Sequence, residues 1–403
     1  MEKTFKKHYI IVFCLIICTI ILSTGVMSSA KAESVAETTT KTQVARSFDL
    51  TDALIAAALH SKADNQDANI KPINTKELYN TSDEITAYEI ILSDYSYIVV
   101  NADLSNPIVI EFGQRDELYC KYSTEKEYYI GPTYRFERAT NKQSELFVSE
   151  SSKSTEIEAT VAELQLAEEK LKTALQSVDT TQKSIHSEAR SLFDASSNGI
   201  SKNKDKNPYD FIIDFSSLPS ASTLSSSKTI TSATSTSITP YGTTNDFDGV
   251  NDADNHCAAT SAYNMVIYYM YRNGDTIPTS ETAREALFTA IHKRIKNGPV
   301  TPSGYRTRIK KYVNNDMSGY SITVDNIRDN WDNYKAECDS NRMSLMCLWP
   351  ALFNAHMVNG IGYRTYSNGS KYCQIINNWY SDLTQYCIFG QALYDLSKIY
   401  ITK

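Results

Sequence analysis

The 403-residue sequence lacks several features that define common classes of protein. It has a formal net charge of −7 and no large basic block, so nucleic acid is not an expected partner. After residue 32, no apolar run is long enough to span a membrane. No residues have the spacing of metal ligands, and we expect neither a metal nor another cofactor. The C-terminus carries no sorting motif.

The N-terminus has the pattern of a secretory signal peptide. Three lysines precede an apolar run over residues 9–21, and small residues at 30–32 fit cleavage after Ala32. The apolar stretch 9–27 could instead remain as an uncleaved anchor. The exported chain is tyrosine-rich and mildly acidic, which is typical of extracellular enzymes and adhesins. We expect it outside the cell, either released or at the cell surface, with no stable membrane partner once the signal is removed.

The cysteine count bounds the chemistry. Two cysteines leave with the signal, and the exported chain keeps Cys120, Cys257, Cys338, Cys347, Cys373 and Cys387. An even set in an exported protein suggests three disulfides, and the pair Cys373 and Cys387 on nearby predicted strands is the more plausible bridge. If Cys120 belongs to a removable region, five cysteines remain and one thiol must stay unpaired. That thiol is the candidate for chemistry.

The first half of the exported chain is predicted to form a small sheet domain followed by a helical connector. Within residues 33–153, a short helix is expected at 50–60 and a sheet core over about 84–139, with strands at 88–92, 95–101, 108–112 and 127–136. Short turns between neighbouring strands imply an antiparallel sheet. Residues 154–193 have no Gly or Pro and show helical spacing of apolar residues, so a long helix or a helical hairpin is expected within a connector over 154–215.

Residues 216–245 are almost entirely Ser, Thr, Ala, Pro and Gly, with isolated apolar residues. Such a tract cannot bury enough apolar surface to offset its ordering entropy, so it is predicted to be an exposed linker. Exposed linkers are preferred sites of proteolysis. We therefore place the main domain boundary and a maturation cleavage here.

Residues 246–403 are predicted to form a compact α+β domain. Helices are expected first and strands second, at 257–271, 280–296, 303–314 and 327–336, and at 344–348, 357–366, 371–379, 385–389 and 397–402. The Asn-Gly pair at 368–369 separates two alternating strands and favours a tight hairpin. Helices followed by a β-meander make an α+β layout.

Cys257 stands at the start of the first of these helices. A cysteine nucleophile acts as the thiolate, and a helix N-terminus favours that charge. Small residues at 258–260 leave room for a substrate, and the apolar residues that follow would hold the helix against a core. A buried or disulfide-bonded cysteine would also fit this position, so both roles remain open.

A cysteine nucleophile also needs a base. His256 is adjacent to Cys257 and poorly aimed at it, because neighbouring side chains diverge. His292 falls among charged residues of a predicted solvated helix face. His356 begins a predicted strand of small and apolar residues, where a sheet would hold it at the edge of a cleft. His356 is therefore the favoured base, with a purely structural histidine as the alternative.

The imidazole in turn needs a group that fixes its orientation. The predicted hairpin brings Asn377 and Asn378 back beside His356. Consecutive strand residues point to opposite faces, so only one of the two can meet the ring. Asn378 is favoured, because Trp379 could then shield the hydrogen bond from water.

An oxyanion also needs a donor beside the nucleophile. Asn251, six residues before Cys257, could supply a side-chain amide, and Asn255 is a weaker choice. Each could also be an ordinary turn residue in an Asp- and Asn-rich loop.

Three blocks in this order, NHCAATSAYNMVIYY (255–269), NAHMVNGIGYR (354–364) and INNWY (376–380), resemble papain-fold cysteine peptidases, most closely the streptopain-like branch. The segment YSYIVVNADLSNPIVIEFG (95–113) looks like the hairpin of streptopain-type pro-domains. The resemblance implies a helical half and an antiparallel β half, an inhibitory pro-region and a linker cleaved on maturation. It also implies site roles: Cys257 as the nucleophile, His356 as the base, Asn378 as the orienting amide and Asn251 in the oxyanion position.

The chain departs from the family pattern at three places. Asn251 stands where the family generally has glutamine, and residues 380–382 replace a glycine- and tryptophan-rich continuation. The helical segment 154–193 has no counterpart in that pattern.

The sequence therefore predicts a secreted zymogen of a cysteine endopeptidase. Its partners would be a protein or peptide substrate and its own pro-region as an intramolecular inhibitor. A cell-wall amidase or transpeptidase on the same fold is one alternative, since the triad is compatible with any acyl-transfer substrate. A non-enzymatic surface adhesin with all its cysteines paired is the other.

Overall fold

The computed structural model describes much of the chain after residue 49. The described residues lie within a compact unit that spans 46–403. Among them, no helix is long and apolar enough to cross a membrane. The predicted signal peptide, Cys120 and most of the predicted linker fall outside the described residues, which are 50–64, 72–102, 108–114, 126–138, 146–148, 158–178, 229–235, 242–247, 250, 256–296, 301–327, 330–348, 356–378, 385–390 and 394–403.

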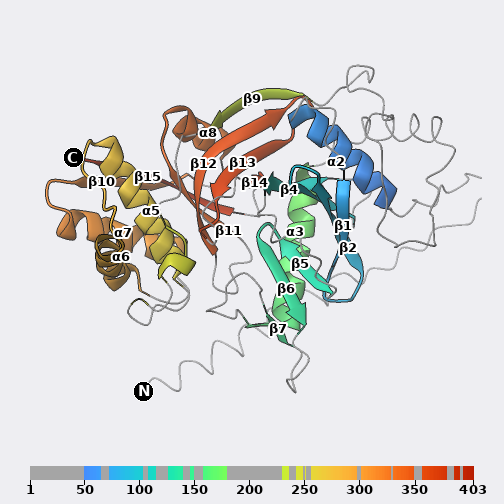
Figure 1. The fold of residues 1–403 in the computed structure, drawn as a ribbon, viewed down its shortest axis with the longest axis horizontal. Coiled ribbons are helices and arrows are strands. Elements are labelled where there is room, and N and C mark those ends of the chain that lie inside the picture. Colours follow the sequence, from blue (N-terminus) through green and yellow to red (C-terminus); the bar gives the residue numbers. More distant parts are fainter. Residues whose placement is uncertain are drawn as a thin grey trace, which may run out of the picture. The chain divides into compact units, whose positions relative to one another are not determined.

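The N-terminal elements of the described residues, most of them labelled in Figure 1, are α2 (Leu50–Asp64), β1 (Pro72–Tyr79), β2 (Ile85–Leu92), β3 (Ser96–Asn101), β4 (Val109–Gln114), β5 (Glu127–Gly131), β6 (Tyr134–Arg138), β7 (Leu146–Val148), β8 (Glu158–Thr160) and α3 (Val161–Val178). The strands follow the order β4-β3-β2-β1-β5-β6-β7-β8 and are antiparallel except for the β1 and β5 pair. Both helices bury apolar residues. Those of α3 recur every three or four positions, as expected for an amphipathic helix: Leu164, Ala167, Leu171, Ala174 and Leu175.

The C-terminal elements are β9 (Ile230–Ser235), the short 3₁₀ turn η4 (Asn245–Phe247), α5 (Cys257–Arg272), α6 (Glu281–Ile295), α7 (Pro302–Asp316), β10 (Ser321–Asn326), α8 (Trp331–Asp339), β11 (Ser344–Leu348), β12 (His356–Tyr366), β13 (Lys371–Ile376), β14 (Gln385–Ile388) and β15 (Tyr394–Thr402). Local sequence sets several helix starts. The side chains of Ser280 and Thr301 accept hydrogen bonds from the third residue of their helices, and Pro302 occupies the first position of α7.

The C-terminal strands follow the order β10-β15-β11-β12-β13-β14, with antiparallel neighbours throughout; β11 to β14 form a meander, and β15 inserts between β10 and β11. The turn between β12 and β13 places Gly369 at a φ of 83°, a left-handed conformation that glycine adopts readily. This is the hairpin expected from the Asn-Gly pair. The described chain is thus a mixed α+β protein with a large, mostly antiparallel sheet, and the α+β class predicted from the sequence is confirmed at that level.

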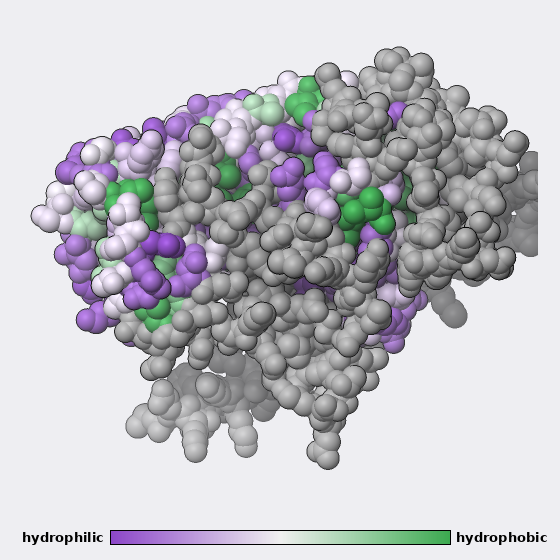
Figure 2. Space-filling model, viewed as in Figure 1, coloured by the Kyte–Doolittle hydropathy of each residue, from purple (hydrophilic) through white to green (hydrophobic). Residues whose placement is uncertain are grey.

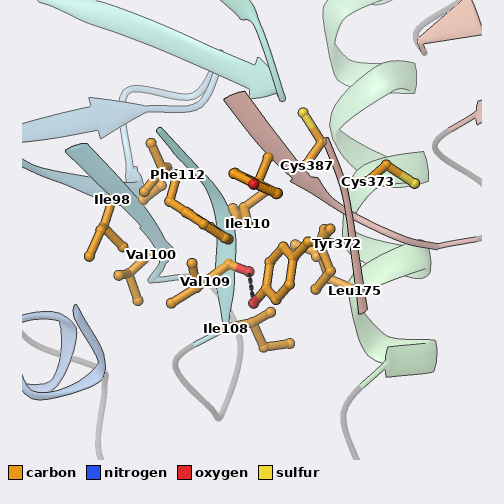
Figure 3. Packing of buried hydrophobic residues seen from close by; sticks show 14 of the residues in the cluster. Ile98, Val100, Ile108, Val109, Ile110, Phe112, Leu175, Tyr372, Cys373 and Cys387 are labelled. Atoms are coloured by element: carbon orange, nitrogen blue, oxygen red, sulfur yellow. Dashed lines mark hydrogen bonds between the residues drawn. The ribbon is translucent and has the colours of Figure 1, made fainter. Parts of the chain in front are cut away.

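The N-terminal and C-terminal strands join in a single sheet, because β4 pairs with β14. Figure 3 shows the side chains packed at this junction, including Val109 and Phe112 of β4 and Tyr372 of β13. The Tyr372 hydroxyl donates to the Val109 carbonyl at 3.0 Å. Phe112 stacks on Tyr386 of β14, with ring centroids 4.7 Å apart. The N-terminal strands therefore continue the C-terminal sheet edge to edge.

Part of the predicted linker forms a strand. Residues 230–235 make β9, which pairs antiparallel with the second half of β12, and none of its residues is buried. A strand can add to a sheet edge through backbone hydrogen bonds alone, so a serine- and threonine-rich segment can pair without a hydrophobic core. Gly362 of β12 permits this close approach, since a Cβ there would lie 2.3 Å from the Thr234 carbonyl oxygen. The prediction of an exposed linker over 216–245 missed the backbone pairing of β9, whose residues alternate between half-buried and exposed, and the burial of residues 242–244.

Apolar side chains are scattered over the surface. Figure 2 shows small, separate hydrophobic patches among hydrophilic residues on the coloured part of one face. The large apolar side chains exposed among the described residues are Ile73, Tyr95, Leu166 and Tyr271. They come from different parts of the chain and are scattered singly, as is usual on a protein surface.

Candidate active site

Cys257 is the first residue of α5, as the sequence predicted. The helix presents an almost continuous buried surface from Ala258 to Tyr269, which anchors it in the C-terminal core. Asn359 of β12 donates to the Ser261 carbonyl at 3.2 Å and so ties the first turns of α5 to that strand. The Cys257 thiol is partly buried and is not part of a disulfide. The nucleophile candidate therefore has a rigid support.

The sulfur of Cys257 lies against β12. Burial raises the pKa of Cys257, while hydrogen bonds from the backbone N–H groups of Met357 and Ala258 oppose that rise. Met357 directly follows His356, so α5 and β12 bring the two predicted residues to the same place. Tyr305 of α7 is also near the sulfur: burial raises the pKa of its phenol, and the Cys257 thiol adds to the rise.

His356 is the first residue of β12 and is only 1% exposed. Its Nε2 atom lies 2.6 Å from the main-chain oxygen of Asn377. A carbonyl oxygen can only accept, so Nε2 carries the proton and Nδ1 of the neutral ring is left as the basic nitrogen. Burial lowers the pKa of His356 to about 3, and the Asn377 carbonyl opposes that shift. The ring is therefore neutral in this state.

The lowered pKa predicts acid sensitivity. An unfolded chain takes up a proton on this histidine near pH 6.5, whereas the folded chain does so only near pH 3. The stabilisation is therefore complete above pH 6.5 and is lost as the pH falls towards 3. Between pH 7.5 and pH 4.5, we expect His356 to account for a loss of about 2.5 kcal/mol in the free energy of unfolding.

Urea unfolding at the two pH values would measure this effect. His356→Gln should reduce the pH dependence by about that amount, because glutamine does not titrate. His292→Gln, on the partly exposed face of α6, serves as the matched control and should leave the pH dependence as it is. Equal pH dependence in wild type and His356→Gln would contradict the buried neutral imidazole.

Asn377 and Asn378 follow β13 directly, but the side chain of Asn378 does not bind the imidazole of His356 as predicted. The side-chain amide of Asn378 donates to the Met357 carbonyl at 2.8 Å rather than to His356. The imidazole is held by the main chain of Asn377 instead. The physical reason is the backbone of Asn378, whose φ of 67° ends the strand and directs its side chain to β12 and α5. Asn378 thus orients the residue that follows the histidine, not the ring itself.

Asn264 is a member of this network that sequence reasoning missed. It lies two turns after Cys257 on α5, fully buried, and donates to Asn378 Oδ1 at 2.9 Å. It also bonds both backbone groups of Gly242, donating to the carbonyl at 2.8 Å and accepting from the N–H at 3.0 Å. One signal was available: Asn264 is the single polar amide in the otherwise apolar and aromatic run 262–270.

The other histidine next to the cysteine has a structural role. His256 is buried, and its Nε2 lies 2.9 Å from the Thr244 carbonyl oxygen. The Thr244 N–H in turn donates to the Asn378 carbonyl at 2.7 Å. His256 therefore ties the start of α5 to residues 242–247, in keeping with the prediction that it is badly aimed for catalysis. The predicted oxyanion residue Asn251, its alternative Asn255 and the covering residue Trp379 lie outside the described residues.

The candidate disulfide is not formed. Cys373 and Cys387 stand directly opposite each other on β13 and β14, yet both are free and buried. None of the cysteines among the described residues is part of a disulfide; they stand at positions 257, 338, 347, 373 and 387. The adhesin alternative requires every exported cysteine to be paired. The described part of the chain shows no such pairing.

Comparison with known proteins does not assign the chain to a family. The chain matches no protein-family model and no curated protein. Within the described part of the chain, no group of three or more His, Cys, Asp or Glu side chains could hold a metal ion. The chemistry of the site must therefore be argued from its own residues.

Proposed function

We propose that this chain is the secreted precursor of a papain-like cysteine endopeptidase. The observation that carries the proposal is the meeting of Cys257 and the start of β12: the sulfur accepts from the backbone N–H of Met357, the neighbour of His356. A cysteine thiol outside any disulfide, at a helix start and next to the residue that follows a histidine whose Nε2 is occupied, suits nucleophilic acyl transfer.

In the proposed reaction, Cys257 Sγ attacks the carbonyl carbon of a peptide bond while His356 Nδ1 takes the thiol proton. The imidazolium then gives that proton to the leaving amine, and a thioester remains on the sulfur. Water, deprotonated by the same ring, hydrolyses the thioester and restores the thiol. Asn377 and Asn378 hold the ring and its strand through both steps.

The state described here suits a latent precursor. Burial raises the pKa of Cys257 and lowers that of His356, so the pair rests as a neutral thiol and a neutral imidazole. The N-terminal sheet is paired to β14 in this state. We propose that residues 33–153 act as the inhibitory pro-region and that cleavage between β9 and Gly242, or upstream of β9, accompanies activation.

A substrate comparison tests the reaction class. The purified chain, after self-processing, is incubated with denatured casein and with purified peptidoglycan, each with and without prior alkylation by iodoacetamide. We expect casein to be cleaved and alkylation to stop it. Turnover of peptidoglycan alone would assign the site to a cell-wall amidase or transpeptidase, and casein cleavage that survives full alkylation of Cys257 would overturn the proposal.

A further inference from the structure

A second amide stands behind the histidine and its carbonyl partner. The side chain of Asn377 donates through Nδ2 to Oε1 of Gln385 at 3.1 Å, while its main-chain oxygen accepts from His356. Both Asn377 and Gln385 are buried, at 6% and 4% exposure. The hydrogen bond between the Asn377 side chain and Gln385 therefore fixes Asn377, and the main-chain carbonyl of Asn377 accepts from the imidazole.

Gln385 is also the point where the N-terminal sheet reaches the site. It is the first residue of β14, and its register partner across the junction is Gly113 of β4. On its other side it pairs with Ile375 of β13, the strand that leads into Asn377. The next residue, Tyr386, is stacked on Phe112 of β4. The strand carrying Gln385 thus has β4 as one of its two neighbours.

From these contacts we propose that Gln385 is a positioning residue for His356, and that docking of β4 on β14 determines how firmly it holds Asn377. The inference rests on the proposed function, because positioning His356 affects catalysis only if His356 is the base of a cysteine peptidase. When β4 pairs with β14, the four-residue strand is hydrogen-bonded on both sides and Gln385 is fixed. When β4 leaves, β14 becomes an edge strand and the support of the Asn377 carbonyl weakens.

Nuclear magnetic resonance of the imidazole N–H tests the positioning directly. The full-length chain is labelled with ¹⁵N-histidine and carries Cys257→Ala to prevent self-cleavage, and the His356 signal is assigned by its absence in His356→Gln. In the parent chain, we expect one tautomer, with the proton on Nε2 and slow exchange with water. Gln385→Met, which keeps the length of the side chain but removes the acceptor, should accelerate that exchange about tenfold.

Two variants separate positioning from a general loss of structure. Gln385→Glu retains an acceptor for Asn377 Nδ2 and should restore slow exchange. Gln374→Met changes a buried glutamine of β13 whose Oε1 has no hydrogen-bond partner, and should leave the exchange rate unchanged. Unaltered exchange in Gln385→Met, or equal acceleration in Gln374→Met, would overturn the positioning role.

Phe112→Leu tests the coupling to β4, because it removes the stack on Tyr386 and keeps an apolar side chain. We expect the His356 N–H to exchange several times faster in this variant. Normal exchange, with acceleration in Gln385→Met, would leave Gln385 as a positioning residue and overturn the link to docking. These signals do not depend on turnover, so a chain that hydrolyses no peptide would refute the proposed function without deciding this inference.

Discussion

Replacing Cys257 by alanine is expected to reduce casein hydrolysis by roughly 10⁴-fold or more, to the level of the uncatalysed background. In the proposed reaction a bond forms to this sulfur, and no other described cysteine is the first residue of a helix. The variant should also accumulate as the uncut precursor. Its fold should be retained, since the thiol is partly exposed and alanine suits a helix.

Hydrolysis is measured with fluorescent casein, and processing by mass spectrometry of the exported product. Cys338→Ala is the matched control, because Cys338 is a free, buried thiol on α8. It should keep hydrolysis within a small factor of wild type. If Cys257→Ala hydrolyses casein at the wild-type rate, Cys257 is a packing residue and the activity belongs to another site.

Elements with strong local signals could be predicted well from the sequence. The pattern expected at 257–271 became α5 at 257–272, and β11 has the predicted bounds. A single strand expected at 127–136 is instead the hairpin of β5 and β6, since Gly131 and Pro132 interrupt it and Thr133 takes a φ of 71°. The helix expected from residue 154 begins at 161, because residues 158–160 pair with β7. In these two cases, turn chemistry and strand pairing overrode periodicity.

Some residues of the candidate site could be predicted from the sequence and others could not. Cys257 and His356 could be selected because a helix start and a strand start each leave a pattern in the sequence. The roles of Asn377 and Asn378 could not, because they depend on a left-handed backbone at Asn378, which asparagine adopts more often than most residues but does not dictate. Asn264 bonds Asn378, which is 114 residues further along the chain, and Gln385 bonds Asn377, which is 8 residues before it. Only the folded chain brings these amides together.

Replacing Arg135 by methionine is expected to cost about 4 kcal/mol in the stability of the N-terminal sheet at pH 7. Arg135 lies among three buried glutamates. It binds Glu89 through two hydrogen bonds, at 2.7 and 2.8 Å, and Glu127 at 2.9 Å, and its guanidinium is 3.5 Å from Glu111. The glutamates are between 1% and 4% exposed. The ion pair between Lys76 and Glu127 would remain in the variant.

The penalty should depend on pH. Burial raises the pKa of Glu127, but the charges of Arg135 and Lys76 outweigh it, so the pKa lies below the ordinary value of 4.5. In wild type, the stabilisation from Glu127 is present above pH 4.5 and is lost as the pH falls through the lowered value. In Arg135→Met, burial favours the protonated carboxyl, so the stability gap between variant and wild type should be widest at pH 7 and narrower at pH 4.

Hydrogen–deuterium exchange of β2 to β5 in increasing urea measures the stability of this sheet at both pH values. Arg135→Lys keeps the charge but loses the two-pronged contact with Glu89, and should fall between wild type and Arg135→Met. Arg294→Met removes a solvent-exposed ion pair with Asp316 and should change little. Because Glu111 of β4 lies opposite Cys387 of β14, loss of Arg135 should also loosen the junction with the C-terminal sheet. If Arg135→Met has wild-type stability at pH 7, the glutamates must be solvated or protonated there, and the buried charge cluster does not hold the sheet together.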